Sequence, residues 1–181
     1  MGKKKLLLHS CCGPCSTSVI EKLQHEYDLT IFYYNPNIYP EEEYLKRLAE
    51  QIKYIKLSNK NIKVIDGHYE DSQMFLQAYK GLEECREGGE RCKTCICLRL
   101  KKTAEYAANN NYDIFASTLS VSPHKNAQLI NELGLNLSKE YNIEYLISDF
   151  KKQDGYLNSI KLSKQYDLYR QKYCGCKYSI Y

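Results

Sequence analysis

Five short apolar runs, rich in β-branched and aromatic residues, alternate with longer segments of helical periodicity along this chain of 181 residues. Such alternation is typical of parallel strands joined by helices, because each connecting helix must cover a face of the sheet. We therefore expect an α/β fold with three layers and a mainly parallel sheet. The strands are expected at residues 5–9, 29–34, 61–66, 113–118 and 144–147.

Helical patterns fill the segments between these strands. Pro40 is expected to begin a long helix, because three glutamates follow it where the helix dipole favours negative charge. Its apolar face is expected to hold Leu45, Leu48, Ile52 and Ile55. Ser122 and Pro123 are expected to cap and begin another helix. The remaining helices are expected at residues 16–24, 93–109 and 156–170.

Length and composition narrow the class of protein. A chain of this size most often forms one domain, so residues 1–181 are expected to be a single domain. With 43% hydrophobic and 27% charged residues, the chain is not expected to be disordered. Apolar runs are too short for a membrane span or a signal peptide, so we expect a cytoplasmic protein that does not bind membranes. In that reducing compartment, nine cysteines favour metal or redox roles.

Three of the cysteines directly follow the first expected strand. They are Cys11, Cys12 and Cys15. Ligands of parallel α/β sheets gather at the carboxyl ends of the strands, so this position predicts a binding site. The loop 117–125 and Asp149 follow two other strands and are expected at the same edge.

A second pair, Cys92 and Cys95, has the C-x2-C spacing that lets two thiolates bind one metal. The pair stands at an expected helix N-terminus, where the dipole lowers thiol pKa values. Together with Cys11 and Cys12 it provides four thiolates, enough for zinc or an iron–sulfur cluster. Neighbouring cysteines diverge and suit two irons better than one zinc, which favours the cluster.

A third group is the pair Cys174 and Cys176, separated only by Gly175. A disulfide between them closes a small, strained ring, and strain makes such a bond easily reduced. The pair is therefore a candidate store of two electrons, with further metal ligands or buried thiols as the alternatives. Cys85 and Cys97 receive no role, because buried free cysteines are common.

Positive charge is concentrated at the carboxyl-terminal end. Residues 151–181 hold seven basic and two acidic residues, together with six of the 18 tyrosines. Cations interleaved with aromatic rings suit phosphate contacts and base stacking in RNA binding. A solvated helix face with core tyrosines is the alternative explanation.

Five motifs together resemble the QueH family, the cobalamin-independent epoxyqueuosine reductases, nearly from end to end. They are residues 9–15 (HSCCGPC), 89–95 (GERCKTC), 120–126 (SVSPHKN), 149–152 (DFKK) and 169–176 (YRQKYCGC). The resemblance implies a Rossmann-like fold of the HUP type, with a cysteine-rich insertion and a helical carboxyl-terminal segment. It also implies reduction of epoxyqueuosine to queuosine at the wobble position of tRNA, with an electron donor that is not identified.

The resemblance further implies a [4Fe-4S] cluster on Cys11, Cys12, Cys92 and Cys95. A second metal ion, an iron, is implied beside the cluster, with Cys15 as the residue expected to contact it. The catalytic residues implied or expected are Cys174, Cys176 and the acid Asp149, with His9 and His124 as alternative acids. The residues expected to contact RNA are Lys125, Lys151, Lys152, Arg170 and Tyr173.

Two competing functions remain at this point. A tRNA-modifying ATPase on a related fold needs a glycine-rich phosphate loop after the first strand, and residues 11–15 lack those glycines. A non-catalytic tRNA-binding module with structural zinc would use the same cysteines. Metal content separates this second alternative from a reductase.

Overall fold

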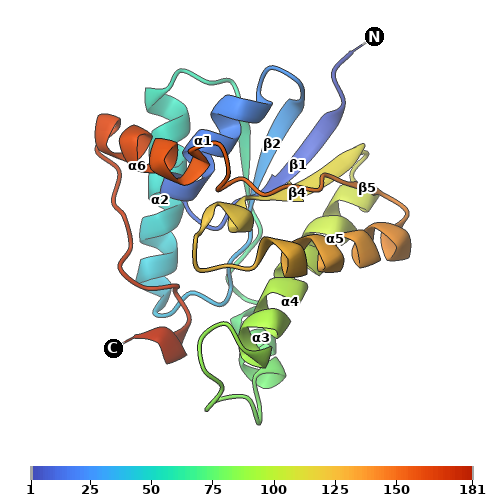
Figure 1. Cartoon of the computed structure of the whole chain (residues 1–181), viewed down its shortest axis with the longest axis vertical. Coiled ribbons are helices and arrows are strands. Elements are labelled where there is room, and N and C mark those ends of the chain that lie inside the picture. The colour runs from blue at the N-terminus through green and yellow to red at the C-terminus, as the bar shows by residue number, and fades with distance from the viewer. Residues whose placement is uncertain (1, 181) are drawn as a thin grey trace.

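Within residues 2–180, which the computed structural model describes, five parallel strands form one sheet in the order β3-β2-β1-β4-β5 (Figure 1). The strands are β1 (Lys5–His9), β2 (Asp28–Tyr33), β3 (Lys63–Asp66), β4 (Ile114–Ser117) and β5 (Glu144–Tyr145). Because all of them are parallel, their carboxyl ends meet at one edge of the sheet. The expected parallel α/β fold is confirmed.

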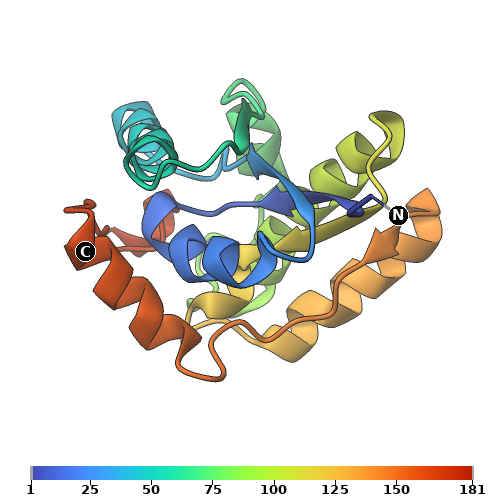
Figure 2. The same cartoon turned by 90° about the horizontal axis from the view of Figure 1, so that it is seen from above.

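Helices cover both faces of this sheet (Figures 1 and 2). One apolar cluster joins the sheet to α3, α4 and α5, and a second joins it to α1 and α2. Helix α6 lies beside α1, and two short 3-10 turns complete the chain. The helical elements are α1 (Gly13–Leu23), α2 (Glu41–Leu57), α3 (Ser72–Ala78), α4 (Glu90–Asn109), α5 (Ala127–Tyr141), α6 (Gly155–Gln165), η1 (Thr118–Val121) and η2 (Lys177–Ser179).

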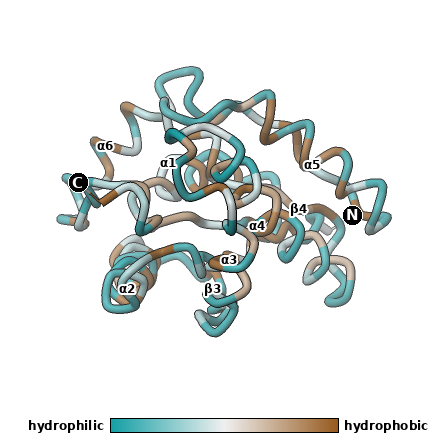
Figure 3. Tube along the Cα trace, turned by 90° about the horizontal axis from the view of Figure 1, so that it is seen from below, coloured by the Kyte–Doolittle hydropathy of each residue, from teal (hydrophilic) through white to brown (hydrophobic). Residues whose placement is uncertain are grey.

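The central strand shows why the sheet lies between two layers. Leu6, Leu7 and Leu8 are all fully buried, as expected of a strand covered on both faces. Leu7 packs in the cluster with α4, whereas Leu6 and Leu8 pack in the cluster with α1, because successive side chains point to opposite faces. In Figure 3 hydrophilic residues predominate in the outer loops of the trace. No helix among the described residues is both long and apolar enough to cross a membrane.

Several helices have other bounds than expected; α4 begins at Glu90 instead of residue 93, and α6 ends at Gln165 instead of residue 170. Helix α1 starts at Gly13 instead of residue 16, because the Cys12 thiol caps it by accepting a hydrogen bond from Cys15 N (3.4 Å). Helix α5 starts at Ala127, where the Asn126 side chain accepts from the first turn. The expectation of a helix starting at residue 122 is therefore wrong, and residues 122–125 form a turn closed by a hydrogen bond from Lys125 N to Ser122 O (3.2 Å) instead.

The buried face of α2 also differs from the expected one. Leu45 and Ile52 are 54% and 36% exposed, so placing them on the buried face was wrong. Gln51 occupies that face, and its side-chain oxygen accepts hydrogen bonds from Ser10 Oγ (2.6 Å) and Ser16 Oγ (2.9 Å). Helix α2 thus packs a polar side against the loop after β1. Its buried residues are Tyr44, Arg47, Gln51, Tyr54 and Ile55.

Candidate metal centre and active site

A cavity of ≈ 600 Å³ opens at the carboxyl edge of the sheet. The loops after β1, β2 and β4, helix α4 and the carboxyl-terminal segment all contribute to its wall. This is the edge at which parallel sheets bind ligands. Its chemically distinctive lining residues are Cys11, Cys15, Arg99, Lys125, Tyr173 and Cys174.

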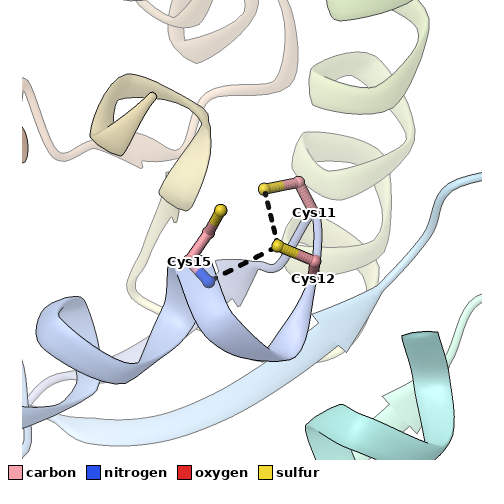
Figure 4. A group of neighbouring side chains, drawn as sticks. All are labelled: Cys11, Cys12 and Cys15. Atoms are coloured by element: carbon pink, nitrogen blue, oxygen red, sulfur yellow. Dashed lines mark hydrogen bonds between the residues drawn. The ribbon is translucent and has the colours of Figure 1, made fainter. Parts of the chain in front are cut away.

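Three thiols converge beside this cavity (Figure 4). The sulfur atoms of Cys11, Cys12 and Cys15 all lie within 4.8 Å of one another. Cys11 and Cys12 follow β1, and Cys15 points toward them from the first turn of α1. The early start of α1 produces this arrangement, because it turns Cys15 back toward the strand end. Three soft sulfur ligands at this spacing suit a transition metal.

Hydrogen bonding makes the three thiols unequal. Bonds from the Cys12 and Cys15 thiols, helped by the Thr118 hydroxyl (Oγ1 to Sγ, 3.5 Å), hold the pKa of Cys11 well below its usual range. Donating to Cys11 raises the pKa of Cys12 to about 12. The same donation raises the pKa of Cys15. The three thiols are therefore linked by hydrogen bonds, and a bound cation would favour their thiolate forms.

The second cysteine pair lies on α4. Because α4 begins at Glu90, Cys92 stands in its first turn and accepts a hydrogen bond from Gly88 N (3.2 Å). Cys95 is 7% exposed and belongs to the apolar cluster against which Cys11 packs. Gly88, which donates to Cys92, and Arg99, whose Nε donates to Cys95 O (3.3 Å), line the same cavity as Cys11, so both cysteine groups lie near this cavity. Cys92 and Cys95 are nevertheless outside the triad whose sulfurs lie within 4.8 Å.

Two cations stand among these sulfurs. Arg99, one helical turn after Cys95, is 3% exposed, and its Nη1 lies 3.5 Å from Asn35 Oδ1. Lys125 places its ammonium 3.6 Å from the sulfur of Cys174. Burial lowers the pKa of Lys125, but the charges of Cys174 and other thiols outweigh burial and raise it. The cavity is therefore built to hold negative charge on sulfur.

Arg47, which is 2% exposed, holds the carboxyl-terminal segment beside the cavity through hydrogen bonds. The Arg47 guanidinium donates to Cys174 O (3.1 Å) and Tyr173 O (3.3 Å). Gln171 Nε2 donates to the sulfur of Cys12 (3.1 Å), which ties the segment to the triad. Cys174 and Cys176 are both free thiols.

Gly175 is the position in this segment that tolerates a side chain least. Its φ is +114°, and an added Cβ would lie 2.9 Å from both Arg47 Nη1 and Ile38 Cγ1. We expect Gly175→Ala to cost about 1–3 kcal/mol and to displace the two cysteines, lowering turnover. Gly81→Ala is the matched control, because Gly81 also has a positive φ (+80°) but open space around it.

Thermal unfolding and turnover of the two glycine variants test this expectation. Gly81→Ala should show the strain cost alone and keep turnover. Equal stability losses with full turnover in both variants would mean that the packing around Gly175 does not matter.

The remaining residues expected at the site occupy different positions. Asp149 is paired with Lys151 (3.1 Å) and Lys152 (3.8 Å). Arg170 lines the cavity while its guanidinium donates to Ser163 Oγ (2.9 Å) on α6. His9 is fully buried, with Nδ1 against Ser117 Oγ and Nε2 against Tyr34 O.

The surroundings of His9 and Tyr173 determine what these two side chains can do at the site. Burial, together with Arg99, lowers the pKa of His9 to about 4. A neutral ring with both nitrogens engaged stabilises the strand ends and is a poor acid. Tyr173 keeps one face of its ring under the Arg47 guanidinium (4.9 Å to the ring centre). His124 lines the cavity.

Three residues of the site were not anticipated from the sequence: Arg47, Arg99 and Gln171. Arg99 carries a usable signal, because it stands four residues after Cys95 on an expected helix and must share its face. Arg47 and Gln171 stand in charged, polar stretches where nothing distinguishes them from surface residues.

A parallel Rossmann-like sheet with converging thiols at its carboxyl edge defines an α/β protein with a thiol site suited to a metal. The model of the family "Epoxyqueuosine reductase QueH" matches residues 6–181 of this chain. The chain therefore belongs to the QueH family of epoxyqueuosine reductases, which are oxidoreductases.

Individual relatives agree with this assignment. "Epoxyqueuosine reductase QueH" of Staphylococcus epidermidis is 45% identical over 182 residues, which cover 98% of this chain and 76% of the relative. The protein of the same name from Thermotoga maritima is 33% identical over 175 residues, covering 97% and 90%.

A solved structure shares the fold. It is described as a predicted subunit of tRNA methyltransferase from Methanocaldococcus jannaschii, and the match covers 89% of this chain and 74% of that one. The TM-score is 0.57 at 18% sequence identity. At this identity the similarity concerns the architecture alone.

Proposed function

We propose that this chain reduces the epoxide of epoxyqueuosine at the tRNA wobble position, giving the alkene of queuosine. Membership in the QueH family supports the reaction. The observation that carries it is the meeting of Cys11, Cys15 and Cys174 on one cavity beside two cations. Since the substrate is tRNA, we also propose a cytoplasmic location.

The residues present fit an iron–sulfur cluster. Cys11, Cys12, Cys92 and Cys95 would hold a [4Fe-4S] cluster, and Cys15 would hold a second iron beside it. Hydrogen bonds already reach three of these sulfurs, from Thr118, Gln171 and Gly88, and such donors tune clusters in proteins. When bound, the cluster supplies single electrons at the cavity.

The thiols of Cys174 and Cys176 can supply the two electrons that the reaction needs. Converting an epoxide to an alkene and water consumes two electrons and two protons. Cys174 and Cys176 release the same number when two thiols become one disulfide. We therefore assign the pair the two-electron role.

For proton donation to the departing oxygen, Lys125 is better placed than Asp149. The Lys125 ammonium lines the cavity beside Cys174, whereas Asp149 is paired with two lysines away from it. Asp149 acts through Lys151, whose ammonium contacts Lys125 O (3.3 Å) and supports this loop. A general acid must reach the atom that it protonates, which favours Lys125.

Nucleoside analysis tests the reaction. The chain is reconstituted anaerobically with iron and sulfide, and it is then incubated with a chemical reductant and tRNA that carries epoxyqueuosine. We expect epoxyqueuosine to disappear and queuosine to appear in equal amount. Unchanged epoxyqueuosine in the presence of a loaded centre would reject the function.

Exposed lysines near the cavity are proposed to contact tRNA phosphates. Lys152, whose side chain is 77% exposed, and Lys172, on the cavity rim, are the sharpest tests. Replacing each by Gln should weaken tRNA binding and reduce the slope of log affinity against log salt by about one per lost phosphate contact. Lys3→Gln is the control, because Lys3 precedes β1 at the opposite edge of the sheet. Equal salt slopes in all three variants would remove these lysines from the interface.

A further inference from the structure

Cys174 and Cys176 face two different cavities. Cys174 lines the cavity that holds the cysteine triad, whereas Cys176 lines a second cavity of ≈ 620 Å³. Between them the carbonyl of Gly175 accepts a hydrogen bond from Tyr39 N (2.7 Å), and Asn37 and Ile38 line both cavities. Cys174 therefore borders the substrate cavity, and Cys176 borders the adjoining second cavity.

The second cavity has unfilled hydrogen-bonding capacity. Tyr79 is 2% exposed and Asn37 is 6% exposed, and both line this cavity. Among the described residues, Asn37 Oδ1 has no hydrogen-bond partner, and it lies where this cavity adjoins the substrate cavity. The Tyr79 hydroxyl has the sulfur of Cys95 as its neighbouring polar atom. Buried polar atoms are normally paired, so the unpaired Asn37 oxygen on the cavity wall indicates that a polar ligand completes it.

The charge of this cavity restricts the ligand. Glu41, Asp66 and Glu70 contribute carboxylates to its wall, against Lys177 and the imidazole of His68. Its volume is that of a small-molecule site. A small ligand with positive charge is therefore favoured over an anion.

The sulfurs of Cys174 and Cys176 also differ in how well their surroundings stabilise a thiolate. Lys125 holds its ammonium 3.6 Å from Cys174 Sγ, so negative charge on that sulfur is stabilised. Burial raises the pKa of Cys176. In a disulfide between them, Cys174 is the better leaving sulfur, because the sulfur whose thiolate is stabilised leaves faster.

We propose that a cationic low-molecular-weight thiol enters the second cavity and reduces a Cys174–Cys176 disulfide by attacking Cys176. The inference rests on the redox role proposed for the pair. The thiolate forms a bond to Cys176 Sγ, the disulfide bond breaks, and Cys174 departs as a thiolate beside Lys125. A second thiol then attacks the mixed disulfide at the sulfur of the small thiol. That step releases Cys176, and the two small thiols end as one disulfide while the pair gains two electrons.

This route keeps reductant and substrate apart. The reducing thiol never has to occupy the substrate cavity, because the departing sulfur already faces it. The proposed reduction requires both cavities and the Lys125 ammonium beside Cys174, and all three are present in the described structure.

The test uses the full reconstituted chain after oxidation of the pair. Cysteamine and 3-mercaptopropionate are added separately, the reactions are quenched with acid during their course, and peptide mass spectrometry locates the mixed disulfide. Rates are normalised to those of the same thiols with a free model disulfide. We expect the adduct on Cys176 with both thiols, and a normalised rate roughly threefold or more higher for cysteamine.

Variants test the parts played by the acidic wall and by Lys125. Glu70→Gln should reduce the preference for cysteamine, whereas Glu87→Gln should not, because Glu87 lines the substrate cavity instead. Lys125→Met should slow the reduction by both thiols. Adducts on Cys174, equal normalised rates for the two thiols, or an oxidised chain in which both cysteines still react with an alkylating agent would each overturn the inference.

Turnover separates this inference from the proposed function. Epoxyqueuosine reduction by the same preparation is measured with dithionite, which does not need thiol exchange. Normal turnover with adducts on Cys174 overturns the thiol route alone. Adducts on Cys176 without any turnover overturn the reductase function and leave the route standing.

Discussion

Cys174→Ser is expected to keep the iron–sulfur centre and to lose turnover by more than about a hundredfold, because a hydroxyl cannot form the disulfide that releases two electrons. Cys174 lies outside the sulfur triad, and only its backbone carbonyl takes part in the bond to Arg47. The serine variant should therefore fold, keep its brown colour and bind tRNA normally. Nucleoside analysis of treated tRNA measures the loss.

Cys85→Ser is the control for this variant. Cys85 is a half-buried free thiol that lines neither cavity. It should retain wild-type turnover. Full turnover in Cys174→Ser would remove the pair from the reaction, and loss of colour in that variant would mean that Cys174 is a metal ligand.

Cys92→Ser is expected to lose the cluster and, with it, turnover. Removing one of four thiolates leaves an iron without its ligand, and even changes outside the ligand set cost metal sites 10–100-fold, as an order of magnitude. We expect iron and sulfide content to fall below about half of the wild-type values. Iron analysis and visible absorbance after anaerobic reconstitution measure this.

The matched control lies on the same helix. Cys97 is a half-buried thiol of α4 only five residues after Cys92. Cys97→Ser should keep both iron and turnover, which separates ligand loss from damage to α4. A Cys92→Ser chain with full iron and sulfide would exclude Cys92 from the cluster.

Much of the fold could be predicted from the sequence, because its signals are local and repeated. The run of Leu6, Leu7 and Leu8 is apolar on both faces, which only a covered strand requires. The order of strands and helices then restricts the connections to a few parallel arrangements. The same order of strands predicts that Cys11 and Cys12 lie at the carboxyl edge of the sheet, without any reference to the family resemblance.

The details of the site could not be predicted, because they depend on interactions that neither composition nor sequence periodicity indicates. Cysteine is an unusual helix cap, so the start of α1 at Gly13, which turns Cys15 toward its neighbours, was not foreseen. The polar face of α2 is buried because Arg47 and Gln51 find partners in segments far away in the sequence. Such long-range pairing leaves no periodic trace, and the apolar residues of α2 misled the assignment of its buried side.

Metal and sulfide analysis of the anaerobically reconstituted chain tests the central claim most directly. That claim is that thiols from the β1 loop and from α4 together hold an iron–sulfur centre at the carboxyl edge of the sheet. The account predicts a brown chain with about four irons and four sulfides in its cluster, one further iron when the second site is filled, and no zinc. A colourless chain with stoichiometric zinc would contradict it and would support the structural zinc site of a non-catalytic tRNA-binding module.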